Sequence, residues 1–211
     1  AFLTCKIKNS NIEFSIGKYF FDGWNHSDPI YEVPKPRLAD INRIKQWNPK
    51  DQLFSRLEYN LVLDSQKIRT YSNIYKEKIT NRGTPRSPYY ESAFDDYYTT
   101  ERRNLGMEYQ KELKKSSLRI LGAFNHFKRI KNTFFNDLTT LSEQLTENDS
   151  DQDTSIFTQL NSRGNWTKNM NQINFQIGYD FNHQSSIGKR IENNINSLTD
   201  IAIFTSSELN F

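Results

Sequence analysis

Apolar and polar residues alternate without interruption over residues 172–182, which read QINFQIGYDFN. The apolar members of this stretch are Ile173, Phe175, Ile177, Tyr179 and Phe181. A period of two residues places them on one side of an extended chain, whereas a helix would mix them with the polar residues. Strands of soluble proteins usually run about five or six residues, but about nine to eleven tilted residues cross a bilayer. The stretch is therefore predicted to be a strand that is long enough to cross a membrane.

The same alternation predicts a series of further strands. They cover approximately residues 1–8, 12–20, 53–63, 67–79, 105–110, 118–124, 156–166 and 201–211. The pattern is weakest in residues 67–79, where Ile68 and Ile74 fall on one face but Tyr71 and Tyr75 fall on the other. That strand is assigned from its neighbours more than from its own pattern. Regular alternation in successive strands is the ordinary mark of an antiparallel sheet with two different faces.

The connections between these strands are alternately short and long. Short turns are expected near residues 9–10, 64–66, 114–116 and 168–169, and long connections over residues 25–50, 80–98, 131–153 and 183–199. Four prolines (Pro29, Pro34, Pro36 and Pro49) exclude a long regular ladder from the first long connection. Outer-membrane barrels have this rhythm because tight turns join the strands at one end and long loops join them at the other. The rhythm favours a membrane barrel over a soluble β-sandwich.

Composition agrees with a barrel and excludes two other classes. The 211 residues have a mean hydropathy of −0.82, and 35% of them are hydrophobic. A barrel tolerates such values, since its interior and its loops are polar and only every second strand residue faces lipid. No run of about 18 apolar residues is present, so a transmembrane helix is not expected. The net charge of +3 comes from 28 basic and 25 acidic residues, a mixture that argues against nucleic acid as a partner.

Several longer stretches resemble the barrel of a TonB-dependent outer-membrane receptor of the Bacteroidetes type. The resemblance is carried, in chain order, by WNPKDQLFSRLEYN (47–60), EKITNRGTPRSPYYESAFDDYYTTERR (77–103), AFNHFKRIKNTFFNDLTTLSE (123–143), DQDTSIF (151–157), GYDFNHQSSIGKRI (178–191) and DIAIFTSSELNF (200–211). It covers most of the chain, from about Phe20 onward, and it is a similarity of whole strands and loops in order.

The resemblance implies a fold, a function and a set of partners. The expected fold is all-β: an antiparallel transmembrane β-barrel segment of about eight strands, an incomplete wall formed by residues 1–211. In that family a signal peptide and a plug domain precede a barrel of twenty-two strands, and neither is found here, so a fragment from the first half of the barrel is expected. The implied function is uptake of a nutrient ligand (oligosaccharide, peptide or siderophore) across the outer membrane. The implied partners are outer-membrane lipid, the protein's own plug domain, TonB and a surface lipoprotein.

The second long connection holds the residues best suited to bind a ligand. Arginines, acids and tyrosines gather there, and together they offer planar stacking surfaces, fixed charges and hydrogen-bonding groups for a polar ligand. The candidates are Arg82, Arg86, Tyr89, Tyr90, Glu91, Asp95, Asp96, Tyr97 and Tyr98. The alternative is that the tyrosines form an interfacial girdle and the charges cross-link neighbouring loops. On the polar faces of the strands, Arg56, Glu58, Gln159, Asn161 and Arg163 are expected to line the interior and to contact a plug or water.

No pattern of reactive residues predicts catalysis, a metal or a cofactor. Asp149, Asp151 and Asp153 have the spacing of a calcium loop, but that loop would need glycine at position 154 and glutamate at position 160. The three histidines are scattered, and no nucleophile elbow marks a catalytic triad. We therefore expect a transport protein with no enzymatic activity.

Two other architectures remain open from the sequence. One is a soluble, lipocalin-like binding barrel with its apolar faces turned inward, and the other is a complete barrel of eight strands. Detergent dependence distinguishes the soluble barrel from a membrane barrel. A barrel segment has two open sheet edges, so the isolated chain is expected to aggregate in water.

Overall fold

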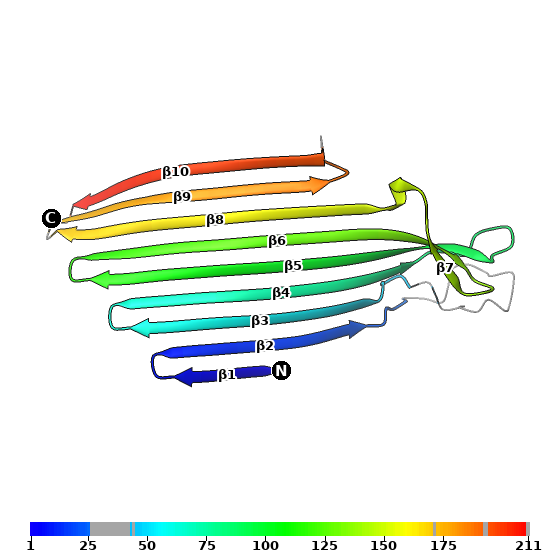
Figure 1. The fold of residues 1–211 in the computed structure, drawn as a ribbon, viewed down its shortest axis with the longest axis horizontal. Helices are drawn as coiled ribbons and strands as arrows, with labels where there is room; N and C mark the ends of the chain where they lie inside the picture. The colour runs from blue at the N-terminus through cyan, green and yellow to red at the C-terminus, as the bar shows by residue number, and fades with distance from the viewer. Residues whose placement is uncertain (26–42, 44, 171, 192–193, 210–211) are drawn as a thin grey trace.

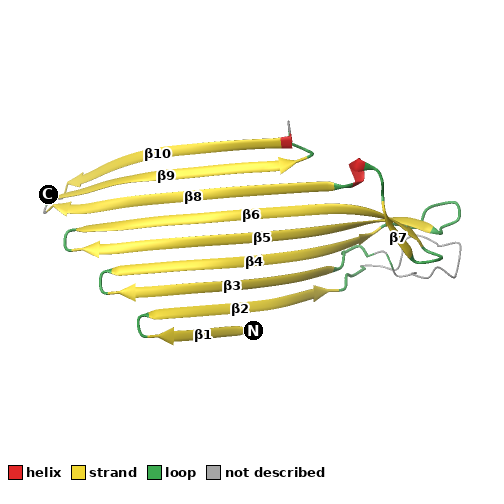
Figure 2. Ribbon diagram, in the orientation of Figure 1, coloured by secondary structure: helices red, strands yellow, loops and turns green. Residues whose placement is uncertain are grey.

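The computed structural model describes residues 1–25, 43, 45–170, 172–191 and 194–209. Pro29, Pro34 and Pro36 of the first expected long connection, and Phe211 at the end of the chain, lie outside these residues. The described residues form one antiparallel sheet with ten strands (Figures 1 and 2). The all-β, antiparallel fold expected from the sequence is confirmed, with ten strands in place of about eight.

Nine of the strands follow one another in space in the order in which they follow along the chain. They are β1 (Phe2–Ile7), β2 (Ser10–Phe21), β3 (Lys50–Leu63), β4 (Gln66–Arg82), β5 (Ser92–Leu113), β6 (Ser116–Asp137), β8 (Asp153–Met170), β9 (Ile173–Gly188) and β10 (Ile195–Leu209). The short strand β7 (Ser142–Leu145) pairs with the outer part of β6. The three-residue 3-10 helix η1 (Asp149–Asp151) precedes β8. No helix in the described part of the chain is long or apolar enough to cross a membrane.

Three of the expected long connections are shorter than the sequence indicated. Residues 80–98 were expected to form a loop, but β4 continues to Arg82 and β5 begins at Ser92. Likewise β6 continues to Asp137 and β9 to Gly188. In these outer segments the ladder hydrogen bonds persist where the alternation of apolar residues stops, because a paired backbone needs no apolar side chains. The sequence pattern therefore marked the apolar part of each strand and missed its polar extension.

The register places most of the apolar residues of the nine strands on one face of the sheet. Along one cross-strand row, Phe14 of β2 lies opposite Leu57 of β3, and Leu105 of β5 lies opposite Phe124 of β6. These side chains are not buried against another layer: Leu105 is 49% exposed, and Ile203 of β10 is 77% exposed. Among the described residues only Ala93 and Leu138 are buried hydrophobics. The apolar faces do not form a closed central core, which contradicts the lipocalin-like alternative.

The opposite face is mostly polar, and hydrogen bonds join the side chains of neighbouring residues on it. Glu58 of β3 accepts from Arg56 Nη2 (2.5 Å), Arg69 Nε (2.8 Å) and Asn60 Nδ2 (3.1 Å). On the same face, nearer the other edge of the sheet, Gln159 Nε2 donates to Asn182 Oδ1 (3.1 Å). Arg56, Glu58, Gln159, Asn161 and Arg163 all lie on this face, as the alternation predicted. The sheet thus has one apolar exposed face, called the apolar face below, and one polar face.

Aromatic rings cover three glycines of the polar face. A Cβ atom on Gly106 would lie 2.3 Å from the Tyr71 ring, its cross-strand partner, and Gly17 and Gly178 lie under Phe54 and Phe204 in the same way. A ring folded over a glycine shields the bare backbone from water and replaces the missing side-chain contact. These pairs fix the positions of three large rings on the polar face.

We expect Gly106→Ala to destabilise the sheet by about 1–3 kcal/mol, because the methyl group would displace the Tyr71 ring. Gly122→Ala is the matched control, since no atom lies within 4 Å of a Cβ built on Gly122 of the adjacent strand. That change should be neutral or stabilising. Urea unfolding of the full-length protein in detergent measures both values, and equal values for the two variants would contradict the prediction.

The sheet has two edge strands, β1 and β10, each paired on one side only. The described order begins at β1 and finishes at β10, and these two strands do not pair with each other (Figure 1). An unpaired edge offers free N–H and C=O groups to any other strand. We expect the 211 residues expressed alone to aggregate in water, as measured by light scattering. A monodisperse soluble monomer without detergent would contradict this expectation.

Candidate ligand-binding loops

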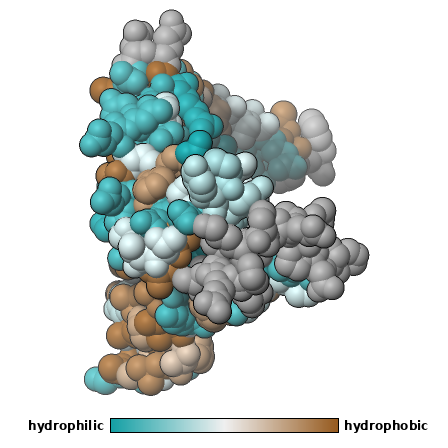
Figure 3. Space-filling model, turned by 90° about the vertical axis from the view of Figure 1, so that its right-hand side faces the viewer, coloured by the Kyte–Doolittle hydropathy of each residue, from teal (hydrophilic) through white to brown (hydrophobic). Residues whose placement is uncertain are grey.

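Tight turns join the strands at one end of the sheet, and longer connections join them at the other, here called the loop end. The turns lie between β1 and β2, β3 and β4, and β5 and β6, on the left of Figure 1. The loop end carries residues 83–91, the β6–β7 hairpin and η1. Seen from this end, hydrophilic residues dominate the upper part of the described surface, and hydrophobic residues gather lower down (Figure 3). The expected alternation of short and long connections is present.

A small core holds the loop end together. It contains Ala93 (0% exposed) and Leu138 (4% exposed). The rings of Phe94 and Phe135 pack edge to face at 5.7 Å beside them. The backbone N–H of Leu138 donates to the Glu91 carbonyl oxygen at 2.7 Å, which ties residues 83–91 to the β6–β7 hairpin. The two segments therefore form one packed unit beyond the apolar face.

A hollow of about 480 Å³ lies between these two segments. Three of the predicted site residues line it: Arg86, Tyr89 and Glu91. Tyr89 is 69% exposed, and the Arg86 guanidinium lies over the Phe94 ring at 4.9 Å. Tyr90 is adjacent, with a left-handed backbone at φ 58°, and its N–H donates to the Arg86 carbonyl oxygen. The hollow presents a ring, a cation and a carboxylate to the solvent.

Asp95, in contrast, is buried against Arg43, a residue of the first long connection. Its carboxylate accepts two hydrogen bonds from Arg43 Nη2, each at 2.5 Å, and one from the Gly83 N–H at 3.0 Å. The side chains of Arg43 and Asp95 are 2% and 3% exposed. Burial raises the pKa of the Asp95 carboxyl, against the lowering effects of the Gly83 N–H and of Arg43. Arg82 is exposed and lines a separate hollow beside Arg43.

The remaining predicted residues lie on β5 and contact neighbouring strands. Asp96 accepts a hydrogen bond from Thr133 Oγ1 at 2.6 Å and pairs with Lys131 at 3.2 Å. The Tyr97 ring packs edge to face against Phe134, and Lys78 lies 4.8 Å from its centre. Burial, followed by a hydrogen bond to Glu143, raises the pKa of Tyr97 to about 12. Tyr98 lies under the guanidinium of Arg129. Of the nine predicted residues, Arg86, Tyr89 and Glu91 therefore line the hollow with Tyr90 beside them, and Arg82 and Asp95 lie beside Arg43. Asp96, Tyr97 and Tyr98 make cross-strand contacts.

The sequence prediction missed the residues that β6 and its hairpin contribute. Phe135, Asp137 and Thr139 line the hollow from the side opposite Tyr89. Asp137 Oδ1 accepts from Thr139 Oγ1 (2.6 Å) and from the N–H groups of Thr139 (2.8 Å) and Thr140 (3.2 Å). These donors lower the pKa of Asp137 to about 2. The sequence Asp-Leu-Thr-Thr could have indicated this turn, because an aspartate side chain often accepts a hydrogen bond from the backbone N–H two residues later.

The hairpin turn should depend on pH through Asp137. A lowered pKa in the folded state means that the ionised carboxylate stabilises the turn, fully above the ordinary value near 3.8. That stabilisation is lost as the pH falls through about 2. Hydrogen exchange of the Thr139 and Thr140 amides, corrected for intrinsic rates, should therefore rise between pH 4 and pH 2. In Asp137→Asn these two amides should exchange fast at every pH. If that variant showed the same rise between pH 4 and pH 2 as the wild type, the assignment to Asp137 would be wrong.

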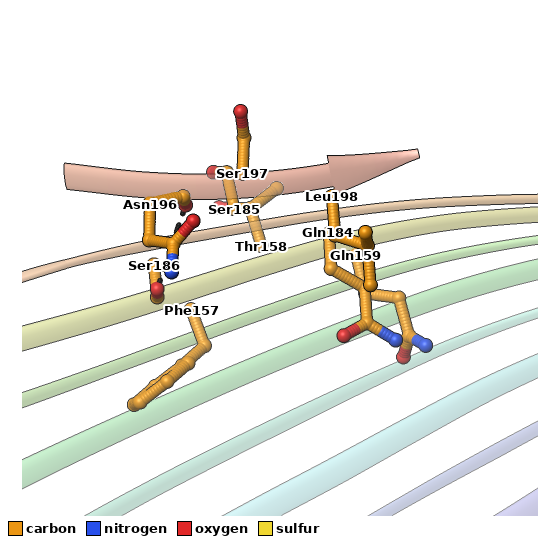
Figure 4. A pocket seen from close by; sticks show the side chains of 9 residues that line it. All are labelled: Phe157, Thr158, Gln159, Gln184, Ser185, Ser186, Asn196, Ser197 and Leu198. Atoms are coloured by element: carbon orange, nitrogen blue, oxygen red, sulfur yellow. Dashed lines mark hydrogen bonds between the residues drawn. The ribbon is translucent and has the colours of Figure 1, made fainter. Parts of the chain in front are cut away.

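A second hollow, of about 430 Å³, lies over β8, β9 and β10. The side chains of Gln159 and Gln184 extend next to each other on one side of the sheet, whereas Ser197 points to the other (Figure 4). This surface is open, and amides and hydroxyls line it together with Phe157 and Leu198. It offers polar contacts on the polar face and no reactive group.

The predicted acidic loop is cross-linked to the end of β9. Asp149 and Asp151 form η1, where the Asp149 carbonyl oxygen accepts from Lys189 Nζ at 2.6 Å. Asp153 pairs with Arg190 at 3.3 Å. Within the described ranges, no three His, Cys, Asp or Glu side chains are grouped as metal ligands.

Comparison with known proteins shows the fold. No protein-family model and no curated protein matches the sequence. Among solved structures, the chain is similar to BauA, the ferric preacinetobactin receptor from Acinetobacter baumannii, with a TM-score of 0.52 and 7% identity, covering 99% of this chain and 36% of BauA. It is also similar to the ferric citrate transporter FecA in its unliganded form, with a TM-score of 0.51 and 10% identity, covering 95% of this chain and 31% of FecA. The chain thus spans about a third of the length of these two proteins, and it shares with that third an antiparallel, all-β fold.

Proposed function

We propose that this chain is part of the barrel wall of a TonB-dependent outer-membrane receptor, of the Bacteroidetes type that its sequence resembles. The observation that carries the proposal is the sheet with two different faces. Its apolar face stays exposed over nine strands, while its polar face is hydrogen-bonded and its longer connections gather at one end. Closed barrels with lipid outside and water inside require this division. The fold shared with BauA and FecA supports the same conclusion.

In this proposal residues 1–211 supply the wall, and the rest of the protein supplies the remaining strands and a plug domain. The apolar face contacts outer-membrane lipid, and the polar face lines the passage. TonB acts on the plug, and a surface lipoprotein assists at the loop end. The wall catalyses no reaction and binds no cofactor; it positions loops that hold the ligand.

The ligand is proposed to be a siderophore, an oligosaccharide or a peptide. BauA is named for ferric preacinetobactin and FecA for ferric citrate, and these names favour an iron chelate. The hollow at Arg86, Tyr89 and Glu91 suits such a ligand, because it combines a stacking surface with both signs of charge.

Membrane extraction tests whether this chain forms part of a barrel wall in the outer membrane. The full-length protein that contains this chain should appear in the outer-membrane fraction and leave it only with detergent. A soluble, monodisperse protein in the absence of detergent would overturn the proposal.

Substitution of Tyr89 tests whether the hollow at the loop end binds the ligand. Tyr89→Ala should weaken ligand binding roughly tenfold or more, since an exposed ring in a hollow is a typical binding anchor. Thr84→Ala is the matched control, an exposed residue of the same connection that does not line the hollow. Binding of a panel of ferric chelates, oligosaccharides and peptides to cells with each variant gives the result. An equal loss for both variants would contradict the assigned site.

A further inference from the structure

An amide side chain occupies the same height on β4, β5, β6, β8 and β9, which are neighbours in the sheet. The register places these five residues opposite one another in turn on the polar face. They are Asn73, Asn104, Asn125, Gln159 and Gln184, called the amide row below. The same line continues to Arg56 of β3 on one side and to Leu198 of β10 on the other. Adjacent strands lie about 4.8 Å apart, so the amide row is roughly 19 Å long.

A row of aromatic rings lies beside the amide row, two residues closer to the loop end on each strand. It consists of Phe54 of β3, Tyr75 of β4, Phe127 of β6 and Phe157 of β8, and is called the aromatic row below. On β5 the same line holds Arg102, whose guanidinium lies 6.0 Å from the centre of the Tyr75 ring and 5.2 Å from that of Phe127. The ring centres of Phe127 and Phe157 are 5.9 Å apart. The rings and the guanidinium therefore follow one another across the central strands.

The two rows meet in the hollow over β8, β9 and β10. Phe157, Gln159 and Gln184 line it, and Ser186 and Asn196 continue the line of the aromatic row into it. Figure 4 shows the Phe157 ring and the two glutamine side chains on the same side of the sheet. Phe157 is 50% exposed, and none of the described residues that line the hollow is ionisable. The hollow thus presents a ring, amides and hydroxyls to the solvent without a charge.

The amides of the row are free to bind a ligand. Asn125 Nδ2 donates to Gln159 Oε1 at 3.4 Å, and among the described residues this is the one hydrogen bond within the row. In the same part of the chain the side chains of Asn73, Asn104 and Gln184 make no hydrogen bond. An amide ladder that served only to stabilise the sheet would be bonded along its length. Each open amide offers two donor hydrogens and an acceptor oxygen.

Ion pairs occupy the polar face on the turn side of the two rows. Glu58 bonds to Arg56 and Arg69, and Arg119 pairs with Glu108 at 2.7 Å. The amide and aromatic rows lie on the loop-end side of these pairs. A ligand that enters the passage from the loop end therefore reaches the two rows first.

Two ionic residues of opposite sign adjoin the aromatic row on its loop-end side. Glu77 of β4 accepts from Tyr75 Oη at 2.8 Å and from Gln52 Nε2 at 2.6 Å. Arg129 of β6 lies 4.9 Å from the centre of the Tyr98 ring. With Arg102, this part of the wall carries one net positive charge over β4 to β6, whereas the hollow over β8 to β10 carries none.

We propose that the amide row and the aromatic row bind an uncharged oligosaccharide on the wall of the passage. The inference rests on the proposed function and selects one of its three ligand classes. A sugar ring has faces of C–H groups that pack on aromatic rings, and an edge of hydroxyls that both donate and accept hydrogen bonds. Rings beside amides match these two surfaces. The length of the rows suits several linked sugars.

The other two ligand classes fit this wall less well. A ferric chelate or a charged peptide would lose water in the hollow over β8 to β10 without gaining a counter-charge. An oligosaccharide suits the hollow at Arg86, Tyr89 and Glu91 as well, because ionic side chains form strong hydrogen bonds with hydroxyls. One kind of ligand therefore fits both hollows.

Calorimetric titration of the full-length receptor in detergent tests the site. The probes are linear uncharged oligosaccharides of glucose, galactose, mannose or xylose, with ferric citrate as the charged probe. The wild type should bind at least one of the uncharged oligosaccharides. Phe157→Leu, which removes the flat ring, and Gln184→Ala, which removes an open amide, should each weaken that binding roughly tenfold.

The matched controls are Phe124→Leu and Gln176→Ala. Phe124 lies on the apolar face of β6, and Gln176 lies on the polar face of β9 on the turn side of both rows. Both controls should keep the affinity of the wild type.

Three results would overturn the carbohydrate site and leave the barrel wall in place. They are binding of none of the uncharged oligosaccharides, an equal loss of affinity in the controls, and faster proteolysis of the plug domain in Phe157→Leu and Gln184→Ala with unchanged sugar affinity. The last result would mean that the rows hold the plug. Absence of the full-length protein from the outer-membrane fraction would instead overturn the proposed function.

Discussion

Replacing Ile177 by lysine should destabilise the membrane-inserted protein by about 2–4 kcal/mol. Ile177 lies in the middle of the apolar run of β9, on the apolar face, where it is 40% exposed. Its cross-strand neighbours are Trp166 of β8 and Thr205 of β10. A lysine there would carry its charge into the centre of the hydrocarbon layer, too far from either surface for the side chain to reach water easily. Urea unfolding of the full-length protein in lipid vesicles measures the loss.

Gln176→Lys is the matched control for this substitution. Gln176 is the adjacent residue of the same strand and lies on the polar face, opposite Thr167 and Ser206. A lysine at that position meets water, and its cost should stay below about 1 kcal/mol. Equal costs at the two positions would contradict the assignment of the faces. A larger cost at Gln176 would mean that the sheet is inverted, with its polar face outward.

Alternation alone was enough to assign these faces. Ile177 and Gln176 are adjacent in the strand, so their side chains point to opposite faces of the sheet. This holds for every pair of neighbouring strand residues, whatever the sheet packs against. The strand β4 is the exception: it was assigned from its neighbours more than from its own pattern, and its pairing with β3 confirms the assignment. The sequence also indicated the tight turns, since turn residues stand between the alternating runs.

The loop end was less predictable, because its contacts join distant residues. The outer part of β5 reads SAFDDYYTT, in which no face is consistently apolar, so nothing in the local pattern distinguishes a strand from a loop. The strand is fixed instead by its pairing with β6. The four residues of β7 are mostly polar and gave no signal. Of the nine predicted site residues, those near Tyr89 stayed exposed, whereas Asp95 was covered by an arginine 52 positions away.

The second large effect is expected at that buried pair. Removing the Asp95 carboxylate by Asp95→Ala should weaken the contact that holds Arg43 of the first long connection against β5 by about 3–5 kcal/mol. Arg43 would then keep a buried charge without its counter-ion, and among the described residues its Nε and Nη1 atoms have no hydrogen-bond partner. The Gly83 N–H would lose its acceptor as well. The connection should therefore open, with faster tryptic cleavage after Lys45 by about two orders of magnitude or more.

Comparison of three variants separates the charge from the other contacts. Arg43→Ala removes both guanidinium hydrogen bonds from the buried Asp95 carboxylate, so it should open the connection as Asp95→Ala does. The double variant Arg43→Met with Asp95→Leu removes both charges and fills the site with apolar side chains of similar volume. It should recover most of the protection, short of about 1–3 kcal/mol for the unpaired Gly83 N–H. If the double variant were cleaved as fast as either single variant, the pair would hold the loop end together by geometry that no apolar contact replaces, and the charge argument would be wrong.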